Sequence, residues 1–241
     1  IAVSEIGWAA KDNKDYNDFE RRIGAVCRRL DMHNVNYYIP QPKRKGALSC
    51  NNIAFVDQIT LEYETAEPSK MVYTIDGNDP TSSSVEYTKP LTFSKSTVFK
   101  IRTLLPSGKM GKTNTVVLSK QTYAEGITSA DNLAKGLKAE YYRGLARRSN
   151  EIVGTASETE FITQPKDAKY KIERKTGTPP DMLYNTVLSG YIDILEDGVY
   201  YFSFLGTEFW LDGQLFIDNR GQPVRYSNND RAVALSKGLH A

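Results

Sequence analysis

Apolar residues repeat with two different periods along this chain, and the first is that of a helix. Between residues 15 and 31, apolar side chains recur at spacings of four, three and four. This spacing places them on one face of an amphipathic helix. The members of this apolar stripe are Phe19, Ile23, Val26 and Leu30. Asp15 stands where an N-cap is expected, and a helix of about 17 residues is only marginally stable alone, so the stripe is predicted to cover another element.

A second period, of two residues, begins near residue 53 and is typical of β-strands. Val72 to Ile75 are β-formers, and the D-G-N-D-P sequence that follows ends their strand. It does so because Gly77 tolerates positive φ and Pro80 donates no ladder hydrogen bond. Further strands are predicted at Thr97 to Ile101 and at Thr113 to Leu118. The middle module, residues 53–123, is therefore predicted to be a small antiparallel β-sandwich of the immunoglobulin or fibronectin type.

The third module, residues 136–241, is again β in pattern and is richer in aromatic residues. Its candidate strands are Leu188 to Ile194, Val199 to Phe204, Glu208 to Leu211 and Gln214 to Asp218. In W-L-D-G-Q-L, Asp-Gly lies between alternating apolar residues and predicts a hairpin with a two-residue type I′ turn. Many short strands predict a second, larger β-barrel or sandwich. The whole chain is therefore predicted to be mainly β, with one N-terminal amphipathic helix.

Proline and small polar residues separate these pieces. Two prolines and the K-R-K-G run predict an extended linker over residues 40–52, and the small polar residues 124–135 predict a second linker. Residues 1–39 then form a separate N-terminal piece that holds the helix. The chain ends just after the G-L-H sequence at 238–240. We therefore expect the third module to be incomplete at its C-terminus, with an unpaired sheet edge.

Composition excludes several classes of function. The chain has 31 basic and 29 acidic side chains among 241 residues, a net charge of +2, which gives no electrostatic basis for binding nucleic acid. No apolar run reaches the roughly 20 residues needed to span a bilayer, so membrane insertion is not expected. The two cysteines, Cys27 and Cys50, have neither metal-type nor C-x-x-C spacing, and their disulfide status stays open. With two distant histidines, His33 and His240, the sequence predicts no metal site and no cofactor.

The N-terminal piece and the middle module both carry family motifs. The first piece resembles the last stretch of the catalytic barrel in family-20 glycoside hydrolases, the β-N-acetylhexosaminidases, where an E-x-x-W element leads to a terminal helix. The matching residues are Glu5, Trp8, Leu30, Val35, Asn36 and Tyr37. The middle module is similar to the chitobiase/β-hexosaminidase C-terminal domain, marked by Y-T-x-D-G-x-D-P and a later Y-x-x-P. Here the matching residues are Tyr73, Thr74, Asp76, Gly77, Asp79, Pro80, Tyr87 and Pro90.

The third module looks like the β-barrel module named for anthrax protective antigen. The matching motifs, in order, are G-L-K-A-E-Y-Y at 136–142, S-G-Y-I at 189–192, D-G-V-Y-Y-F at 197–202, W-L-D-G-Q-L-F-I-D at 210–218 and L-S-K-G-L-H at 235–240. Together the resemblances imply the C-terminal accessory region of a β-N-acetylhexosaminidase, separated from its catalytic barrel. They also imply a periplasmic, secreted or cell-surface location.

The resemblance brings no catalytic residues into this chain. Family-20 enzymes use an Asp-Glu pair, in which the Glu is the general acid and the Asp positions the substrate acetamido group as an internal nucleophile. No Asp-Glu dipeptide occurs in this sequence. Glu5 lies in the E-x-x-W element, downstream of the family's sugar pocket, and is interpreted as a packing or salt-bridge residue. Cys27 and His33 are the only nucleophile and base close in sequence, and Cys27 lies beside the apolar stripe. The chain is predicted to be catalytically inactive.

Sugar binding is a separate candidate function. Some protective-antigen-type modules bind sugar through calcium held by adjacent aspartates, but Phe204 and Leu205 occupy the equivalent positions and supply no oxygen ligands. A metal-free route uses Trp210, with Glu208 and Asp212 on the same strand face, since side chains alternate along a strand. The Y-S-N-N-D loop adds polar candidates, namely Tyr226, Asn228 and Asn229. Alternatively, Trp210 packs against a neighbouring loop or module, and the chain is a structural spacer or protein-interaction arm.

Overall fold

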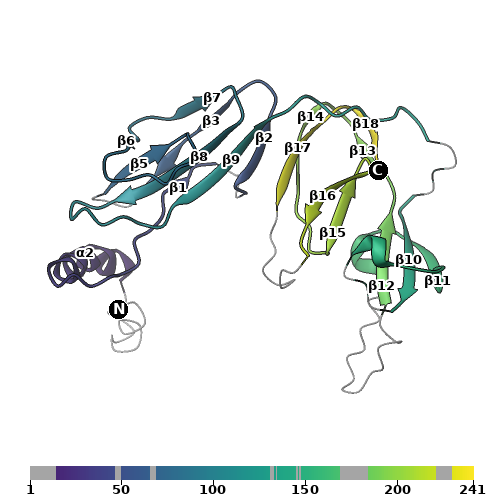
Figure 1. The fold of residues 1–241 in the computed structure, drawn as a ribbon, viewed down its shortest axis with the longest axis horizontal. Helices are drawn as coiled ribbons and strands as arrows, with labels where there is room; N and C mark the ends of the chain where they lie inside the picture. Colours follow the sequence, from purple (N-terminus) through teal and green to yellow (C-terminus); the bar gives the residue numbers. More distant parts are fainter. Residues whose placement is uncertain are drawn as a thin grey trace, which may run out of the picture. The chain divides into compact units, whose positions relative to one another are not determined.

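Over the described residues the protein is mainly β, with one α-helix near its N-terminus, as the sequence predicts (Figure 1). The computed structural model describes residues 15–46, 50–65, 69–130, 133, 135–144, 146, 148–168, 184–220 and 230–241. Within this part, none of the helices is both long enough and apolar enough to cross a bilayer. The chain falls into two compact units, one drawn from residues 1–45, 62–90 and 100–114 and the other from 46–61, 91–99 and 115–241.

The elements up to residue 120 are helix α2 (Tyr16–Met32) and strands β1 (Lys43–Arg44), β2 (Asn52–Phe55), β3 (Ile59–Leu61), β4 (Tyr63–Glu64), β5 (Lys70–Thr74), β6 (Val85–Glu86), β7 (Leu91–Phe93), β8 (Thr97–Leu104) and β9 (Asn114–Lys120). Those that follow are β10 (Leu137–Arg143), η2 (Ser149–Glu151), β11 (Glu158–Ile162), η3 (Pro165–Asp167), β12 (Tyr184–Ser189), β13 (Ile192–Ile194), β14 (Gly198–Phe202), β15 (Glu208–Leu211), β16 (Gln214–Asp218), β17 (Arg231–Leu235) and β18 (Gly238–His240).

Helix α2 begins where the sequence predicts. The Asp15 carboxylate accepts hydrogen bonds from the backbone N–H groups of Asn17, at 2.9 Å, and Asp18, at 3.3 Å. It thereby satisfies two of the amides that a helix leaves without partners at its first turn. All four members of the apolar stripe are only half-buried. The described residues therefore cover the stripe in part.

The main sheet of the middle module has the strand order β2-β9-β8-β5-β6. Strands β5 and β8 are antiparallel, with Lys70 opposite Leu104 and Thr74 opposite Lys100. Strands β2 and β9, in contrast, pair in parallel, with Asn52 opposite Val117. The predicted antiparallel pairing holds for the pairs β1–β4, β3–β7, β5–β6 and β5–β8 of the module but not for this one. A parallel pair requires a long connection between its strands, and the first and last strands of the module have one.

Alternation along β8 builds the core of this sheet. Phe99, Ile101 and Thr103 are buried, whereas Val98 is exposed. At the end of β5, Gly77 has a φ of 84°, the left-handed conformation that glycine tolerates. Asp76 accepts a hydrogen bond from the backbone N–H of Asn78 at 3.0 Å and thereby caps the turn. Asp79 forms an ion pair with Lys100 at 2.8 Å.

The segment 40–52, expected to be an extended linker, contains strand β1. Lys43 pairs with Glu64 and Arg44 with Tyr63 in an antiparallel register. The Pro40 carbonyl also accepts a hydrogen bond from the hydroxyl of buried Thr103 at 2.6 Å. These backbone partners, distant in sequence, give the segment a fixed path that its composition does not predict.

The third module consists of several small sheets, and its described strands form no closed barrel. Their orders are β11-β10-β12, β13-β18, β14-β17 and β15-β16. One core cluster contains Ala139, Tyr141, Ile162 and Ala168, and another contains Ile194, Leu211 and Leu235. Ala124 and Ile127, in the segment predicted as the second linker, form β-bridges with Leu235 and Leu239. That segment therefore contributes backbone hydrogen bonds to β17 and β18.

Candidate functional site

The hairpin of β15 and β16 presents the predicted sugar-binding tryptophan. Asp212 and Gly213 form its turn with φ values of 50° and 74°, and a type I′ turn requires positive φ at both positions. The predicted two-residue hairpin is therefore confirmed. A β-bulge lies between Phe209 and Trp210, where the pairing shifts by one residue. The extra residue is Phe216 on β16, so alternation is interrupted on that strand and continues along β15.

Trp210 and Glu208 lie together, as alternation predicts. The indole of Trp210 is 45% exposed, and its Nε1 donates a hydrogen bond to Glu208 Oε2 at 3.2 Å. The side chain of Glu208 is only 7% exposed. The backbone N–H of Ser149 donates to the same oxygen at 3.3 Å, and Arg220 Nε lies 3.6 Å from Oε1. These partners orient both the carboxylate and the indole beside it.

Glu208 is held in its ionised form. Burial raises the pKa of its carboxyl, but the hydrogen bonds from Ser149 and Trp210 and the charge of Arg220 lower that pKa by more. The net effect is a pKa below the ordinary value. Glu208 therefore acts as a fixed hydrogen-bond acceptor, unlike a general acid, which needs a raised pKa.

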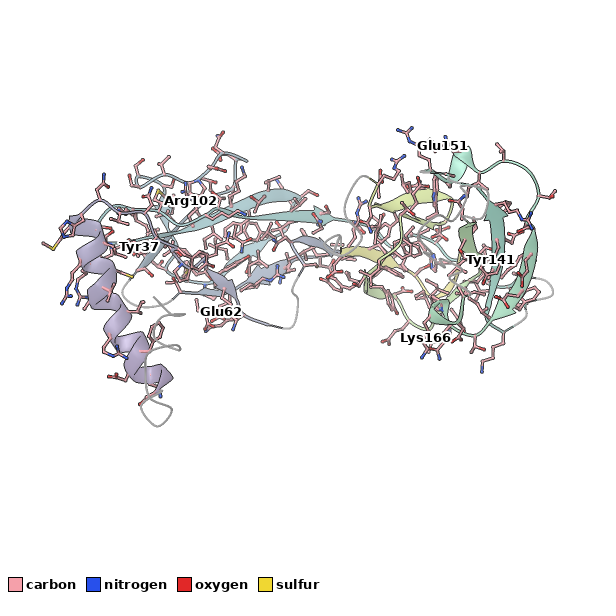
Figure 2. The ribbon with its side chains drawn as sticks, turned by 90° about the horizontal axis from the view of Figure 1, so that it is seen from below. Tyr37, Glu62, Arg102, Tyr141, Glu151 and Lys166 are labelled. Atoms are coloured by element: carbon pink, nitrogen blue, oxygen red, sulfur yellow. The ribbon has the colours of Figure 1, made fainter. Side chains whose placement is uncertain are left out.

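Arg220 joins Glu208 to a second carboxylate, that of Asp218. Arg220 Nε donates to Asp218 Oδ1 at 2.6 Å and Nη2 donates to Oδ2, so the guanidinium binds the carboxylate through two nitrogens. Hydrogen bonds from Arg220 lower the pKa of Asp218 to about 2. Arg148 Nε lies 3.9 Å from Oε1 of Glu151. Glu151 belongs to η2 and is labelled in Figure 2. We call Trp210, Glu208, Ser149, Asp218 and Arg220 the Trp210 site.

Sequence reasoning missed Ser149, Asp218 and Arg220. Glu208 lies opposite Asp218 only because the pairing shifts by one residue at the bulge, so no signal for the arginine was present in the sequence. Two like charges in that position repel and favour a nearby cation. Ser149 gave no signal either, since it is distant in sequence and contributes only a backbone N–H.

The other sequence-predicted residues lie elsewhere. The carboxylate of Asp212 accepts hydrogen bonds from His240 Nδ1, at 2.7 Å, and from the backbone N–H of Ala241, at 3.0 Å. The structure thus joins Asp212 to the end of β18. Tyr226, Asn228 and Asn229 lie outside the described residues, as do Glu5 and Trp8.

The loop between β14 and β15 holds Phe204 and Leu205, the two apolar residues that the resemblance predicts in place of calcium-binding aspartates. The Phe204 ring packs on that of Phe209 with centroids 5.4 Å apart, and Leu205 is 62% exposed. Asn219, which is buried, donates hydrogen bonds from Nδ2 to the carbonyls of Phe204, at 3.1 Å, and Gly206, at 2.9 Å. Over the described residues, no group of three or more His, Cys, Asp or Glu side chains is placed to hold a metal ion.

Comparison with known proteins agrees with the motifs. Residues 53–123 match the chitobiase/β-hexosaminidase C-terminal domain, and residues 133–240 match the PA14 domain. The whole chain is similar to a β-hexosaminidase of Porphyromonas gingivalis, with 38% identity over 248 aligned residues. The alignment covers 100% of this chain but only 31% of that relative. These matches support a C-terminal fragment of a β-hexosaminidase, and this chain has a chitobiase/β-hexosaminidase C-terminal domain followed by a PA14 domain.

Proposed function

We propose that this chain is the non-catalytic accessory region of a β-N-acetylhexosaminidase that hydrolyses terminal N-acetylhexosamine from glycans. The two domain matches and the missing Asp-Glu dipeptide support this role. In this proposal, residues 1–39 belong to the catalytic barrel, and residues 53–123 and 136–241 are the accessory modules. The intact enzyme acts in the periplasm, on the cell surface or in the surrounding medium, where glycan substrates occur.

The third module, in this proposal, also binds glycan at the Trp210 site. The observation that carries it is the half-exposed indole, oriented by a hydrogen bond to a nearly buried carboxylate. An indole face stacks on the apolar face of a pyranose ring, and neighbouring polar groups hydrogen-bond the hydroxyls. Asp218 and Arg220, both partly exposed, supply an acceptor and donors beside it. Orientation of the indole before binding reduces the entropy lost when the sugar docks.

Trp210→Ala is expected to weaken glycan binding by roughly tenfold or more, since a lost stacking contact costs about 1.5 kcal/mol or more. The measurement is a calorimetric titration of the whole chain with oligosaccharides that end in N-acetylhexosamine. Phe161→Ala is the matched control, because Phe161 is also an exposed aromatic residue, 68% exposed, but lies on β11. Equal losses in the two variants, or no binding by the parent chain, would argue for the spacer role.

Helix α2 supports a second role for this chain, in which it interacts with another part of the protein. Its C-terminal end is attached to the turn between β8 and β9, where Lys109 lies 3.2 Å from Asp31 and donates to the Val35 carbonyl at 2.8 Å. Tyr37, labelled in Figure 2, donates from its hydroxyl to Asp31 at 3.0 Å. Burial and that hydrogen bond raise the pKa of Tyr37 to about 12. The apolar stripe stays half-buried, and we propose that the catalytic region of the same polypeptide covers it.

The amides of α2 are expected to exchange roughly tenfold or more faster in this chain than in the intact enzyme, because the covering surface is absent. Hydrogen exchange followed by mass spectrometry measures this difference. Amides of β8 serve as the control and should exchange equally in both proteins. If α2 is equally protected in both, and this chain stays monomeric at high concentration, another surface or none covers the stripe.

A further inference from the structure

His240 is a fully buried histidine near the end of the third module. It lies on β18 opposite Ile192 of β13, and its exposed fraction is 0%. Burial favours the neutral form of a histidine unless its ring nitrogens are paired. The partners of those nitrogens therefore decide its charge.

Both ring nitrogens of His240 face hydrogen-bond acceptors. Nδ1 lies 2.7 Å from Asp212 Oδ2, and Nε2 lies 3.0 Å from the Ser236 carbonyl oxygen. A neutral imidazole carries one N–H and can donate to one acceptor, whereas an imidazolium donates to both. A carbonyl has no proton to offer in return, so the arrangement suits the doubly protonated ring.

The ring is enclosed by four segments of backbone. The hairpin turn of β15 and β16 contributes Asp212, the only charged side chain among the described residues for which a contact with the ring is seen. The β17–β18 turn contributes Ser236, and β13 contributes Ile192. From the fourth side comes Gly126, where an added Cβ would lie 2.8 Å from Nε2. We call His240, Asp212, Ser236 and Gly126 the His240 cluster.

We propose that His240 is held as an imidazolium and that its pH-dependent hydrogen bonds join the β15–β16 turn to β18. Both backbone and side chain of Asp212 take part, since Asp212 N–H donates to the Ala241 carbonyl and Oδ1 accepts from Ala241 N–H. When the ring loses a proton, one of its nitrogens carries a lone pair in place of an N–H group. That lone pair faces an acceptor oxygen, so one hydrogen bond is lost. The turn that ends the Trp210-bearing strand then loses its charged partner, whether or not that strand binds sugar.

The direction of the pH dependence follows from the same contacts. Burial lowers the pKa of His240, but the hydrogen bonds to Asp212 and Ser236 raise it by more, so the net pKa lies above the ordinary value. A group whose pKa is raised by folding stabilises the folded state fully below its unfolded pKa, which is about 6.5 for histidine. That stabilisation is lost as pH rises through the folded pKa.

The test is a titration of the imidazole ¹⁵N signals in the whole chain by NMR. His33→Gln, which removes the other, exposed histidine, assigns the signals. We expect His240 to carry protons on both nitrogens at pH 6 and to titrate above about 6.5. One unprotonated ring nitrogen at pH 6, or a midpoint below that value, would overturn the proposal.

Thermal unfolding of variants gives an independent readout. The melting temperature of the third module is expected to fall as pH rises through the His240 midpoint, and this fall should be absent in His240→Gln. Asp212→Asn keeps a side chain that tolerates positive φ but removes the charge, so it should lower the His240 midpoint. The proposal would be contradicted if the melting temperature of His240→Gln had the same pH dependence as that of the parent chain. It would also be contradicted if the midpoint of the His240 titration were unchanged in Asp212→Asn.

Discussion

Phe99→Ala is expected to lower the free energy of unfolding of the middle module by about 3–5 kcal/mol. Phe99 is 0% exposed, and its ring meets that of Phe93 at 5.5 Å with the planes 63° apart. The substitution removes the apolar transfer free energy of the ring and leaves a cavity that the sheet can fill only in part. Because a module typically has a stability of only 5–15 kcal/mol, this loss is a large share of it.

Chemical denaturation of the whole chain, followed by amide exchange in β8, measures the change for that module. Val98→Ala is the matched control on the same strand, since Val98 is 38% exposed and points to the opposite face. Its expected cost is below about 1 kcal/mol, as for most surface substitutions. Similar costs for the two variants would show that Phe99 does not anchor the core.

Asn219→Ala is expected to destabilise the third module by about 2–4 kcal/mol, because it leaves two carbonyls without their donor. The side chain of Asn219 is the donor to Phe204 and Gly206, and its backbone N–H donates to Thr207 at 2.8 Å. The loop they hold connects β14 to the strand that bears Trp210. A weaker loop should therefore also increase the mobility of the indole, measurable by fluorescence anisotropy.

The Asn219→Asp variant separates the effect of the hydrogen bonds on stability from the effect of side-chain volume. Aspartate has nearly the same shape as asparagine but, when ionised, places an acceptor against two carbonyl oxygens, so its cost should equal or exceed that of alanine. Asn150→Ala, at an exposed position of η2, is the control and should change stability by less than about 0.5 kcal/mol. A stable Asn219→Asp protein would mean that the loop is held by the packing of Phe204 on Phe209.

The predictable parts of the fold are those encoded within a few residues. The spacing of the apolar stripe and the carboxylate of Asp15 fixed the helix, and Asp212-Gly213 fixed the hairpin turn. The pairing of β2 with β9 could not be foreseen in the same way. Its partners are separated by most of the module, and the choice between parallel and antiparallel pairing depends on long-range packing, not on local period.

The candidate site also has a part that the sequence predicts and a part that it does not. Alternation placed Glu208 beside Trp210, and the hydrogen bond between them is present. Alternation did not predict the partners of Asp212, which lies in the turn and accepts a hydrogen bond from His240. Arg220 reaches the site from beyond the end of β16, where the chain no longer follows a strand. The alternation of side chains along a strand therefore gives no information on where Arg220 lies.

The parallel pairing of β2 and β9 also determines how the middle module responds to tension. The chain enters at the start of β2 and leaves at the end of β9, and these ends lie at opposite extremes of the pair. A pull on both sides of the module therefore slides the strands along each other. The hydrogen bonds of this ladder, such as Val117 N–H to Asn51 O and Gln121 N–H to Phe55 O, are loaded together rather than one after another. We therefore expect the ladder of β2 and β9 to resist such a pull through all of its hydrogen bonds at once.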